Sequence, residues 1–239
     1  EVLPGPREER TVELPDGRRL GVAEFGPADG RGILWFHGTP GGRRQVPPAA
    51  RRAARDLGVR IVGVDRPGTG ASSQHLYPDL RAWADDVAVL ADRLALDRFG
   101  VIGLSGGGPY VLACAHELPD RVVAGVVLGG VAPTVGEDAA EGGLVDLTRL
   151  LRHPLALARR PLGLAISSAV LALRPVGRQA LGLYSLVSLP GDRAAFAAPG
   201  MTEMFLDDLN GAAARGGLHG PFADIVLFGR HWGFSVADI

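Results

Sequence analysis

Lysine is absent from this 239-residue sequence, and cysteine occurs only once, at Cys114. A phosphate-binding P-loop requires a lysine, so that class of nucleotide site is excluded. One cysteine excludes an internal disulfide framework, and we therefore expect a reducing, cytoplasmic location. The arginines are scattered and the formal net charge is −1, so nothing in the charge pattern favours nucleic acid as a partner.

Long apolar runs and metal-ligand spacings are also scarce. The longest apolar runs, Val122–Val135 and Pro161–Leu173, fall short of the roughly 18 residues that a membrane-spanning helix needs. We therefore expect no membrane partner. No pair of histidines has metal-ligand spacing, and the segment HELPD at His116 lacks the second histidine of a zinc HExxH motif. The sequence predicts neither a metal nor a cofactor.

Apolar segments of strand length recur through the first half of the chain. Four of them are almost continuously apolar: Gly32–Phe36, Val59–Asp65, Arg98–Leu104 and Arg121–Gly130. Three helix-length stretches alternate with them: Arg43–Leu57, Asp79–Leu94 and Gly106–Leu118. This alternation predicts an α/β fold, with a mostly parallel sheet and helices on both faces. An antiparallel hairpin, Arg10–Leu14 with Arg19–Phe25, precedes it around the turn Asp16-Gly17.

The pattern changes after about Ala132. Residues 135–231 are rich in leucine and alanine at helical spacing, which predicts an inserted helical cap on a core of residues 1–134, with a return segment at 232–239. We expect the cap to cover the candidate site described next. We also expect its helices to be broken at four X-Pro pairs: His153-Pro154, Arg160-Pro161, Arg174-Pro175 and Leu189-Pro190.

One serine stands between glycines at a strand-to-helix transition. The segment Gly103-Leu104-Ser105-Gly106-Gly107 follows an apolar strand and opens a helix, which is the setting of a nucleophile elbow. The glycines remove the Cβ atoms that would collide across such a tight turn. A dinucleotide fingerprint would need glycine at position 105 and an acid after the next strand, and the chain has neither. Ser105 is therefore the candidate nucleophile.

A second glycine-rich segment, WFHGTPGG, follows the strand that ends near Phe36. The main-chain N–H groups of Thr39 and Gly106 would together form an oxyanion hole at the serine. His37 braces this loop in our interpretation, because the general base in this geometry comes after the serine in the chain. The glycine-rich DRPGTGASS is interpreted as a structural turn in which Asp65 accepts hydrogen bonds from nearby N–H groups.

The segments HGTPGG, DRPGTGASS and GLSGGGPY, at these spacings, resemble the α/β-hydrolase fold family. The resemblance covers about residues 10–134 and implies Ser105 as the nucleophile, with Thr39 and Gly106 as oxyanion donors. Serine at the elbow, where related dehalogenases and epoxide hydrolases have aspartate, favours acyl transfer on an ester or amide. An aminopeptidase, a cofactor-free oxidative enzyme and a non-catalytic ligand-binding relative remain alternatives.

The catalytic acid and histidine are harder to find. The resemblance implies an order of Ser, then Asp or Glu, then His. Of the histidines after Ser105, only His231 follows a possible strand, DIVLFG, and Asp192 would be its acid. We prefer a different location for the acid and the histidine, on the basis of the segment WGFSVADI at residues 232–239. A similar stretch in the family leads from the cap into the strand that delivers the acid. We therefore expect the last strands, the acid and the histidine on a C-terminal segment or second chain.

The remaining candidates have structural interpretations. His116, His153 and His219 are expected to be structural or solvated. Cys114 is expected to fill the core. Asp85 and Asp86, with Arg81 and Arg93 nearby, are expected on a solvated helix face. The favoured function is hydrolysis of an apolar small-molecule ester or amide, because the cap is rich in apolar side chains.

Overall fold

The computed structural model describes residues 4–142, 144–187 and 189–239. A six-stranded sheet has the order β1-β2-β4-β3-β5-β6. Its strands are β1 (Glu8–Glu13), β2 (Arg19–Phe25), β3 (Arg31–Phe36), β4 (Val59–Val64), β5 (Phe99–Leu104) and β6 (Val122–Leu128). β1, β2 and β4 are joined by antiparallel pairing, whereas β4, β3, β5 and β6 pair in parallel. The predicted α/β fold is confirmed.

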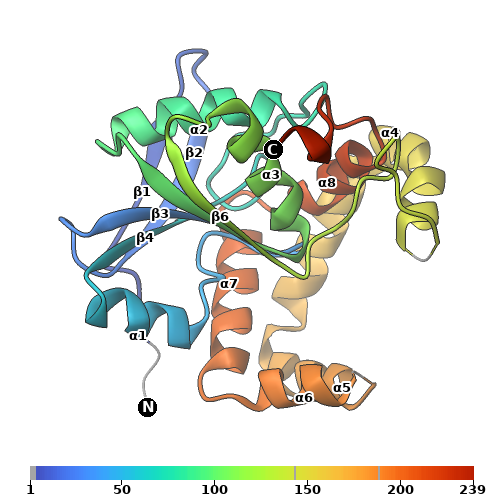
Figure 1. The fold of residues 1–239 in the computed structure, drawn as a ribbon. Helices are drawn as coiled ribbons and strands as arrows, with labels where there is room; N and C mark the ends of the chain where they lie inside the picture. Colours follow the sequence, from blue (N-terminus) through green and yellow to red (C-terminus); the bar gives the residue numbers. More distant parts are fainter. Residues whose placement is uncertain (1–3, 143, 188) are drawn as a thin grey trace.

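Helices cover both faces of this sheet (Figure 1). They are α1 (Pro48–Asp56) on one face and α2 (Ala82–Arg93) and α3 (Gly108–Glu117) on the other. Strand periodicity explains the arrangement, since alternate side chains point to opposite faces. In β3, Leu34 and Phe36 belong to the core cluster with α2 and α3, whereas Trp35 belongs to the cluster with α1. Both faces are thus apolar, as the continuous apolar run requires.

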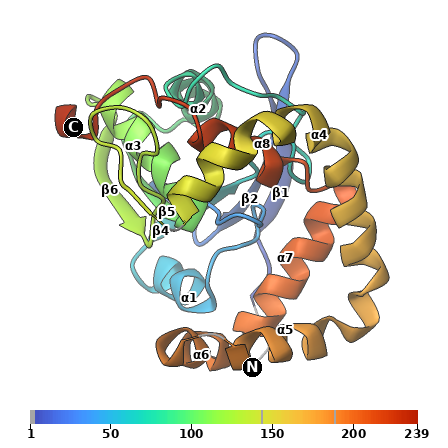
Figure 2. The ribbon, with the colours of Figure 1, turned by 90° about the vertical axis from the view of Figure 1, so that its right-hand side faces the viewer.

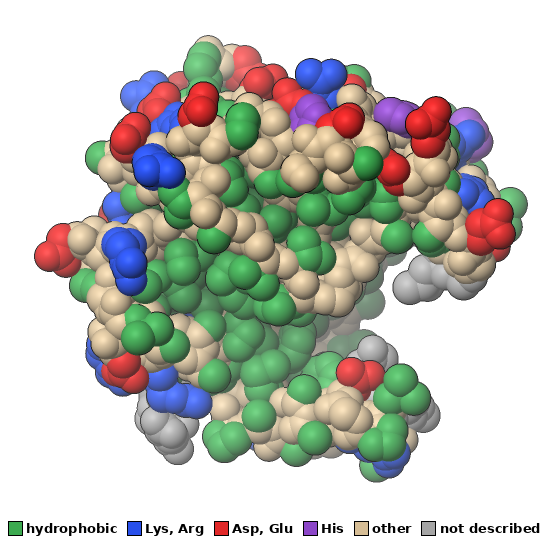
Figure 3. Space-filling model, viewed as in Figure 1, with side chains coloured by type: hydrophobic (Ala, Val, Ile, Leu, Met, Phe, Trp, Pro, Cys, Tyr) green, Lys and Arg blue, Asp and Glu red, His purple; other side chains and the backbone are tan. Residues whose placement is uncertain are grey.

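β6 is the edge strand beside β5, and its side chains are unusually open. Val123 is 54% exposed, and Val126, Val127 and Leu128 are each more than 40% exposed. A long apolar edge of this kind is a template for pairing with another strand. Figure 3 shows hydrophobic side chains gathered over the middle of the face seen in Figure 1, above a hollow beside the outer helices.

The second half of the chain folds into five helices within the described residues. They are α4 (Leu144–Ala172), α5 (Gly177–Val187), α6 (Pro190–Ala197), α7 (Met201–Arg215) and α8 (Gly220–Phe228). α4 and α7 lie side by side and extend away from the sheet to α5 and α6, whereas α8 returns toward the elbow end of the sheet (Figures 1 and 2). The predicted helical character of this lobe is confirmed.

Two of the four expected helix breaks are wrong. α4 continues through Pro154 and Pro161, whereas Pro175 lies in the short 3-10 turn between α4 and α5, and Pro190 is the first residue of α6. The carbonyls four residues before the two internal prolines lose their helical donors. Those carbonyls belong to Leu150 and Leu157, whose residues are 73% and 89% exposed, so water can satisfy them.

The continuity of α4 also changes the membrane argument. Within the described residues, Val145–Ala172 is long and apolar enough to cross a membrane by length and composition alone, and 11% of its apolar window is buried. The search for uninterrupted apolar runs in the sequence did not find this helix, because arginines and prolines divide its apolar residues. A single helix that meets these two criteria does not by itself establish a membrane span.

The expectation for α2 needs one correction. Asp85 is exposed as predicted, but Asp86 is buried. Arg18 donates two hydrogen bonds to its carboxylate, at 2.6 and 2.8 Å, and the Tyr77 hydroxyl donates a third. Asp86 therefore ties the β1–β2 hairpin to α2, a long-range role that helical spacing alone does not reveal.

Candidate active site at the end of β5

Ser105 occupies a strained turn directly after β5. Its φ of 50° lies in the left-handed region, where a residue with a side chain is uncommon. A Cβ on Gly103 would lie 2.4 Å from the Gly107 carbonyl oxygen, and one on Gly107 would lie 2.2 Å from the Phe36 oxygen. Only glycine fits at both positions. The backbone therefore has the geometry predicted for a nucleophile elbow.

The loop after β3 packs against this turn. A Cβ on Gly38 would lie 3.6 Å from Cβ of Ser105, and a Cβ on Gly106 would lie 2.3 Å from Thr39 Oγ1. The structure thus brings together the segments that contain Ser105, Gly106 and Thr39. Among the described residues, the Thr39 main-chain N–H makes no hydrogen bond. That donor is free for a ligand, and the oxyanion role of Thr39 and Gly106 stays a prediction.

His37 lies beneath the loop and is 1% exposed. Its Nδ1 lies 2.7 Å from the Gly38 carbonyl oxygen, and its Nε2 accepts a hydrogen bond from the Arg66 main-chain N–H at 3.2 Å. The carbonyl contact requires the proton on Nδ1. Burial, together with the Arg66 charge, holds the pKa of His37 well below its ordinary value. A neutral ring with both nitrogens engaged braces the loop and is not a base for Ser105.

Where the structure describes the chain, none of the later histidines makes a hydrogen bond with Ser105. Among the described residues, no hydrogen bond is made to Ser105 Oγ. His116 contacts Glu117 and stacks on Phe234, and exposed His231 accepts a bond from the Gly233 N–H at 3.0 Å.

The internal Asp192–His231 alternative therefore loses its structural basis. The possible strand before His231 is the helix α8, because DIVLF continues an apolar segment whose Gly220-Pro221 start suits the first turn of a helix. Asp192 lies in the first turn of α6, at the far end of the lobe from α8 (Figures 1 and 2).

Sequence reasoning missed a buried ion pair near the site. Arg66 is 0% exposed and Asp224, on α8, is 3% exposed. They form an ion pair at 2.6 Å between Arg66 Nη2 and Asp224 Oδ2. A signal for Asp224 was present, since it is a single acid within the apolar segment PFADIVLF. Buried acids are nearly always paired, but a sequence does not name the partner.

Two further buried carboxylates accept hydrogen bonds from main-chain N–H groups of the glycine-rich loop after β3. Asp65 accepts hydrogen bonds from the N–H groups of Arg43 and Ala71, at 2.6 and 2.9 Å, as its predicted turn role requires. Asp208, from α7, accepts bonds from the N–H groups of Gly42 and Arg44, at 2.7 and 2.9 Å. Burial, with the charge of nearby Asp65, raises the pKa of Asp208 to about 7.

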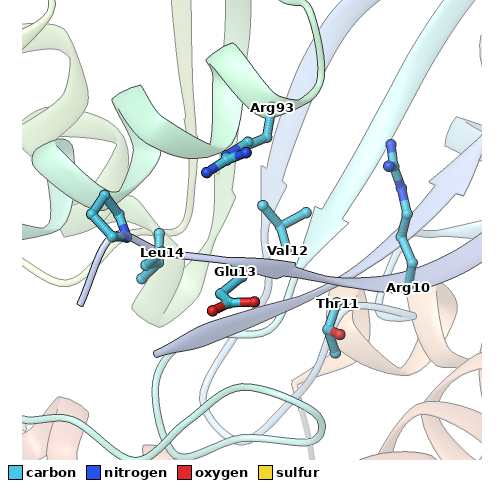
Figure 4. Close-up of a pocket in the computed structure, with 7 residues that line it drawn as sticks. Arg10, Thr11, Val12, Glu13, Leu14 and Arg93 are labelled. Carbon is cyan, nitrogen blue, oxygen red and sulfur yellow. The ribbon is translucent and has the colours of Figure 1, made fainter. Parts of the chain in front are cut away.

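A large open hollow lies elsewhere, at the β1 edge of the sheet (Figure 4). Its volume is about 550 Å³, and it is lined by Arg10, Thr11, Val12, Glu13, Leu14, Pro15 and Arg93. β1 is the edge opposite β6, four strands away from β5 in the sheet order. The residues that line this hollow include no histidine, serine or cysteine.

Comparison with known families identifies the fold independently. A family profile described as alpha/beta hydrolase fold matches residues 33–174, which include the loop after β3 and the elbow. The chain belongs to this family. The resemblance inferred from the motifs is thereby confirmed.

Individual relatives point to several activities. A proline iminopeptidase of Arabidopsis thaliana is 30% identical over 129 residues, which are 53% of this chain and 33% of that protein. A non-heme chloroperoxidase of Streptomyces lividans is 32% identical over 137 residues, 52% of this chain and 46% of that one. The matched segment thus spans a third to a half of these curated relatives. Hydrolase activity is consistent with the family, whereas the substrate differs among members.

Solved structures extend the likeness to the lobe. An alpha/beta hydrolase fold protein from Nakamurella multipartita is 27% identical, with a TM-score of 0.58, and the match covers 94% of this chain and 75% of that one. A thermophilic esterase from Thermogutta terrifontis has a TM-score of 0.62 at 20% identity, covering 94% and 73%. The second likeness concerns the fold alone.

Proposed function

We propose that the protein is a serine hydrolase that cleaves an ester or amide through an acyl-enzyme at Ser105. The observation that carries the proposal is the strained backbone of Ser105, packed against a loop in which the Thr39 N–H makes no hydrogen bond to any residue that the structure describes. Strain of this kind persists only where the surrounding structure imposes it, and it concentrates at functional sites.

In this mechanism Ser105 Oγ attacks the substrate carbonyl carbon, and its proton passes to a histidine base. The carbonyl oxygen becomes an oxyanion that accepts hydrogen bonds from the N–H groups of Thr39 and Gly106. Collapse of the tetrahedral intermediate expels the alcohol or amine, which takes the proton from the histidine. Water, activated by the same histidine, then hydrolyses the acyl-enzyme and regenerates the serine.

The base and its acid are proposed to come from a further strand-bearing segment, either a continuation of this chain or a second chain. The exposed apolar side chains of β6 support this, since another strand would cover them. The partial coverage of the relatives agrees with it. Without that segment, the Ser105 hydroxyl stays protonated and is a weak nucleophile.

The proposed substrate is a small molecule with an apolar acyl or alcohol part. The leucine- and alanine-rich composition of the lobe supports an apolar preference. We propose a reducing, cytoplasmic location, because the one cysteine, Cys114, has no second cysteine with which to form an internal disulfide. An aminopeptidase or a cofactor-free oxidative enzyme is the second candidate, favoured by the iminopeptidase and chloroperoxidase relatives.

Burst kinetics test this proposal. The complete protein, mixed with p-nitrophenyl butyrate, is expected to release p-nitrophenol in a burst equal to the enzyme concentration, followed by slower turnover. Ser105→Ala is expected to abolish both phases. Turnover of an aminoacyl-p-nitroanilide, or of halide and peroxide, without ester hydrolysis would favour the second candidate. Binding of an apolar ester without turnover would make the protein a non-catalytic relative.

A further inference from the structure

A lobe residue reaches the proposed oxyanion loop directly. The Asp224 carboxylate, on α8, accepts a hydrogen bond from Thr39 Oγ1 at 2.6 Å, although 185 residues separate the two. The Tyr110 hydroxyl donates to the other oxygen of Asp224 at 2.7 Å, and Arg66 completes the ion pair. Every member of this group is at least nine-tenths buried except Thr39, which lies at the open end.

Arg66 binds the same loop at three successive residues. Its Nη1 donates to the His37 carbonyl oxygen, and its Nη2 donates to the Gly38 oxygen at 3.2 Å and to Thr39 Oγ1 at 2.8 Å. A guanidinium has five donors in a rigid plane, so one side chain can fix several oxygens at once. Asp224 in turn fixes the guanidinium.

The Thr39 hydroxyl therefore both donates and accepts a hydrogen bond within the protein. It donates to Asp224 and accepts from Arg66, so its remaining task is to hold the Thr39 backbone in place. Oxyanion donors act because they are held in position before charge develops, and removing one donor costs about 10²- to 10³-fold in kcat.

We propose that Asp224 and Arg66 are positioning residues that hold the Thr39 N–H in the oxyanion geometry, so that the lobe helix α8 sets the activity of the elbow. The inference rests on the proposed function, in which Thr39 is an oxyanion donor. It assigns the lobe a role beyond covering the substrate. A displacement of α8 would loosen the loop as well as open the site.

A second ion pair, between Asp86 and Arg18, serves as a control that distinguishes a positioning role of Asp224 from a purely stabilising one. Asp86 is also a buried carboxylate bound by one arginine and one tyrosine hydroxyl, Arg18 and Tyr77, but it does not contact the loop. Asp224→Asn and Asp86→Asn therefore remove the same charge from similar surroundings. Any effect on kcat that is specific to the Asp224 site reports on the loop.

Steady-state hydrolysis of p-nitrophenyl butyrate by the complete protein tests the proposal. Asp224→Asn is expected to lower kcat about 10- to 100-fold with KM within about 3-fold, because the lost interaction acts in the transition state. Arg66→Lys is expected to give a similar loss, since one ammonium cannot hold three oxygens in a plane. Asp86→Asn is expected to keep the wild-type kcat. Equal kcat values for Asp224→Asn and Asp86→Asn would overturn the proposal.

A milder variant and a stability measurement keep the two proposals distinguishable. Thr39→Val leaves the ion pair in place and removes only the hydroxyl link, and it is expected to lower kcat without unfolding the protein. If the wild type hydrolyses nothing, the proposed function fails. Then a double-mutant cycle between Thr39→Val and Asp224→Asn, read as the unfolding equilibrium constant of this chain, decides the coupling. The unfolding equilibrium constant of the double variant is expected to differ by more than about 5-fold from the value that independent single effects would give. A difference of less than about 2-fold would overturn the proposed coupling between Thr39 and Asp224.

Discussion

The carboxylate of Asp208, on the lobe helix α7, accepts a hydrogen bond at 2.7 Å from the main-chain N–H of Gly42. A Cβ at Gly42 would lie 3.0 Å from Asp65 and 3.1 Å from Asp208, so two buried acids flank this one glycine. Asp224 and Asp208 thus attach two different lobe helices to one loop. Each attachment is a carboxylate whose removal has a measurable consequence.

Asp208 makes the stability of the chain depend on pH. Its folded pKa of about 7 lies above the ordinary value of 3.8, so the folded state holds a proton that the unfolded state releases. The contribution of Asp208 is therefore most favourable below about pH 4 and is lost as the pH rises to about 7, by an amount on the order of 4 kcal/mol.

Urea unfolding between pH 4.5 and 8 measures this slope. Asp208→Asn carries no titrating group, so the free energy of unfolding of the variant relative to wild type is expected to rise with pH across this interval. Asp207→Asn removes the exposed neighbouring carboxylate, whose charge is the smallest of the causes that raise the pKa of Asp208, and it is expected to keep most of the wild-type slope. A difference between Asp208→Asn and wild type that is constant with pH would contradict the assignment.

Asp86→Asn is expected to destabilise the chain by about 2 kcal/mol, because it removes the buried carboxylate that pairs with Arg18 and leaves that guanidinium with only the exposed Asp16 as a charged partner among the described residues. Asp85→Asn changes an exposed carboxylate one residue away and is expected to stay within about 0.5 kcal/mol of wild type. The measurement is the urea midpoint at constant m-value. Equal midpoints for the two variants would show that the Arg18 pair contributes nothing to stability.

Gly106→Ala tests the packing of the elbow on the loop. The added methyl would meet Thr39 Oγ1 at 2.3 Å, and Thr39 cannot move without breaking its bonds to Asp224 and Arg66. We expect a loss of about 1 to 3 kcal/mol in the free energy of unfolding. Gly100→Ala is the control, since its methyl would meet Ile33 Cγ1 at an ordinary 3.5 Å. Similar stability of the two variants would contradict the close packing described here.

Because the edge strand β6 exposes apolar side chains, we expect the chain to self-associate when it is purified alone. Val123→Lys places a charge on that edge and is expected to reduce association, because edge charges oppose strand pairing. Sedimentation velocity measures the distribution of species. Leu157→Lys, at an 89% exposed position of α4, is the contrast. If Leu157→Lys yields the monomer and Val123→Lys does not, the lobe and not the sheet edge is the associating surface.

The sequence predicted those features that depend on local chemistry. Strands buried on both faces leave continuous apolar runs, and a nucleophile elbow leaves glycines at fixed offsets from Ser105. The burial of Asp86 and Asp224 was not predicted, because it depends on Arg18 and Arg66, which are 68 and 158 residues away in the sequence. Local spacing places a carboxylate on a helix face but does not say what packs against that face.

The wrong helix breaks have a similar cause. Proline in the interior of a helix removes one helical hydrogen bond, and the cost depends in part on whether the freed carbonyl meets water. Pro154 and Pro161 lie on the exposed side of α4, which only the packing of α4 against α7 and α8 decides. The rule that a helix ends before a proline therefore holds at Pro175 and Pro190 but fails at the two prolines of α4, where the tertiary arrangement leaves the freed carbonyls in water.

Covalent labelling of Ser105 by a fluorophosphonate tests the central claim most directly. Peptide mapping of the complete protein after reaction is expected to find one adduct, on Ser105, whose formation is abolished by Ser105→Ala and unaffected by His231→Ala. The 239-residue chain alone is expected to label slowly or not at all, and to regain labelling when the strand-bearing segment is supplied. Rapid labelling of the chain alone that is lost in His231→Ala, or an adduct on any residue other than Ser105, would contradict the account.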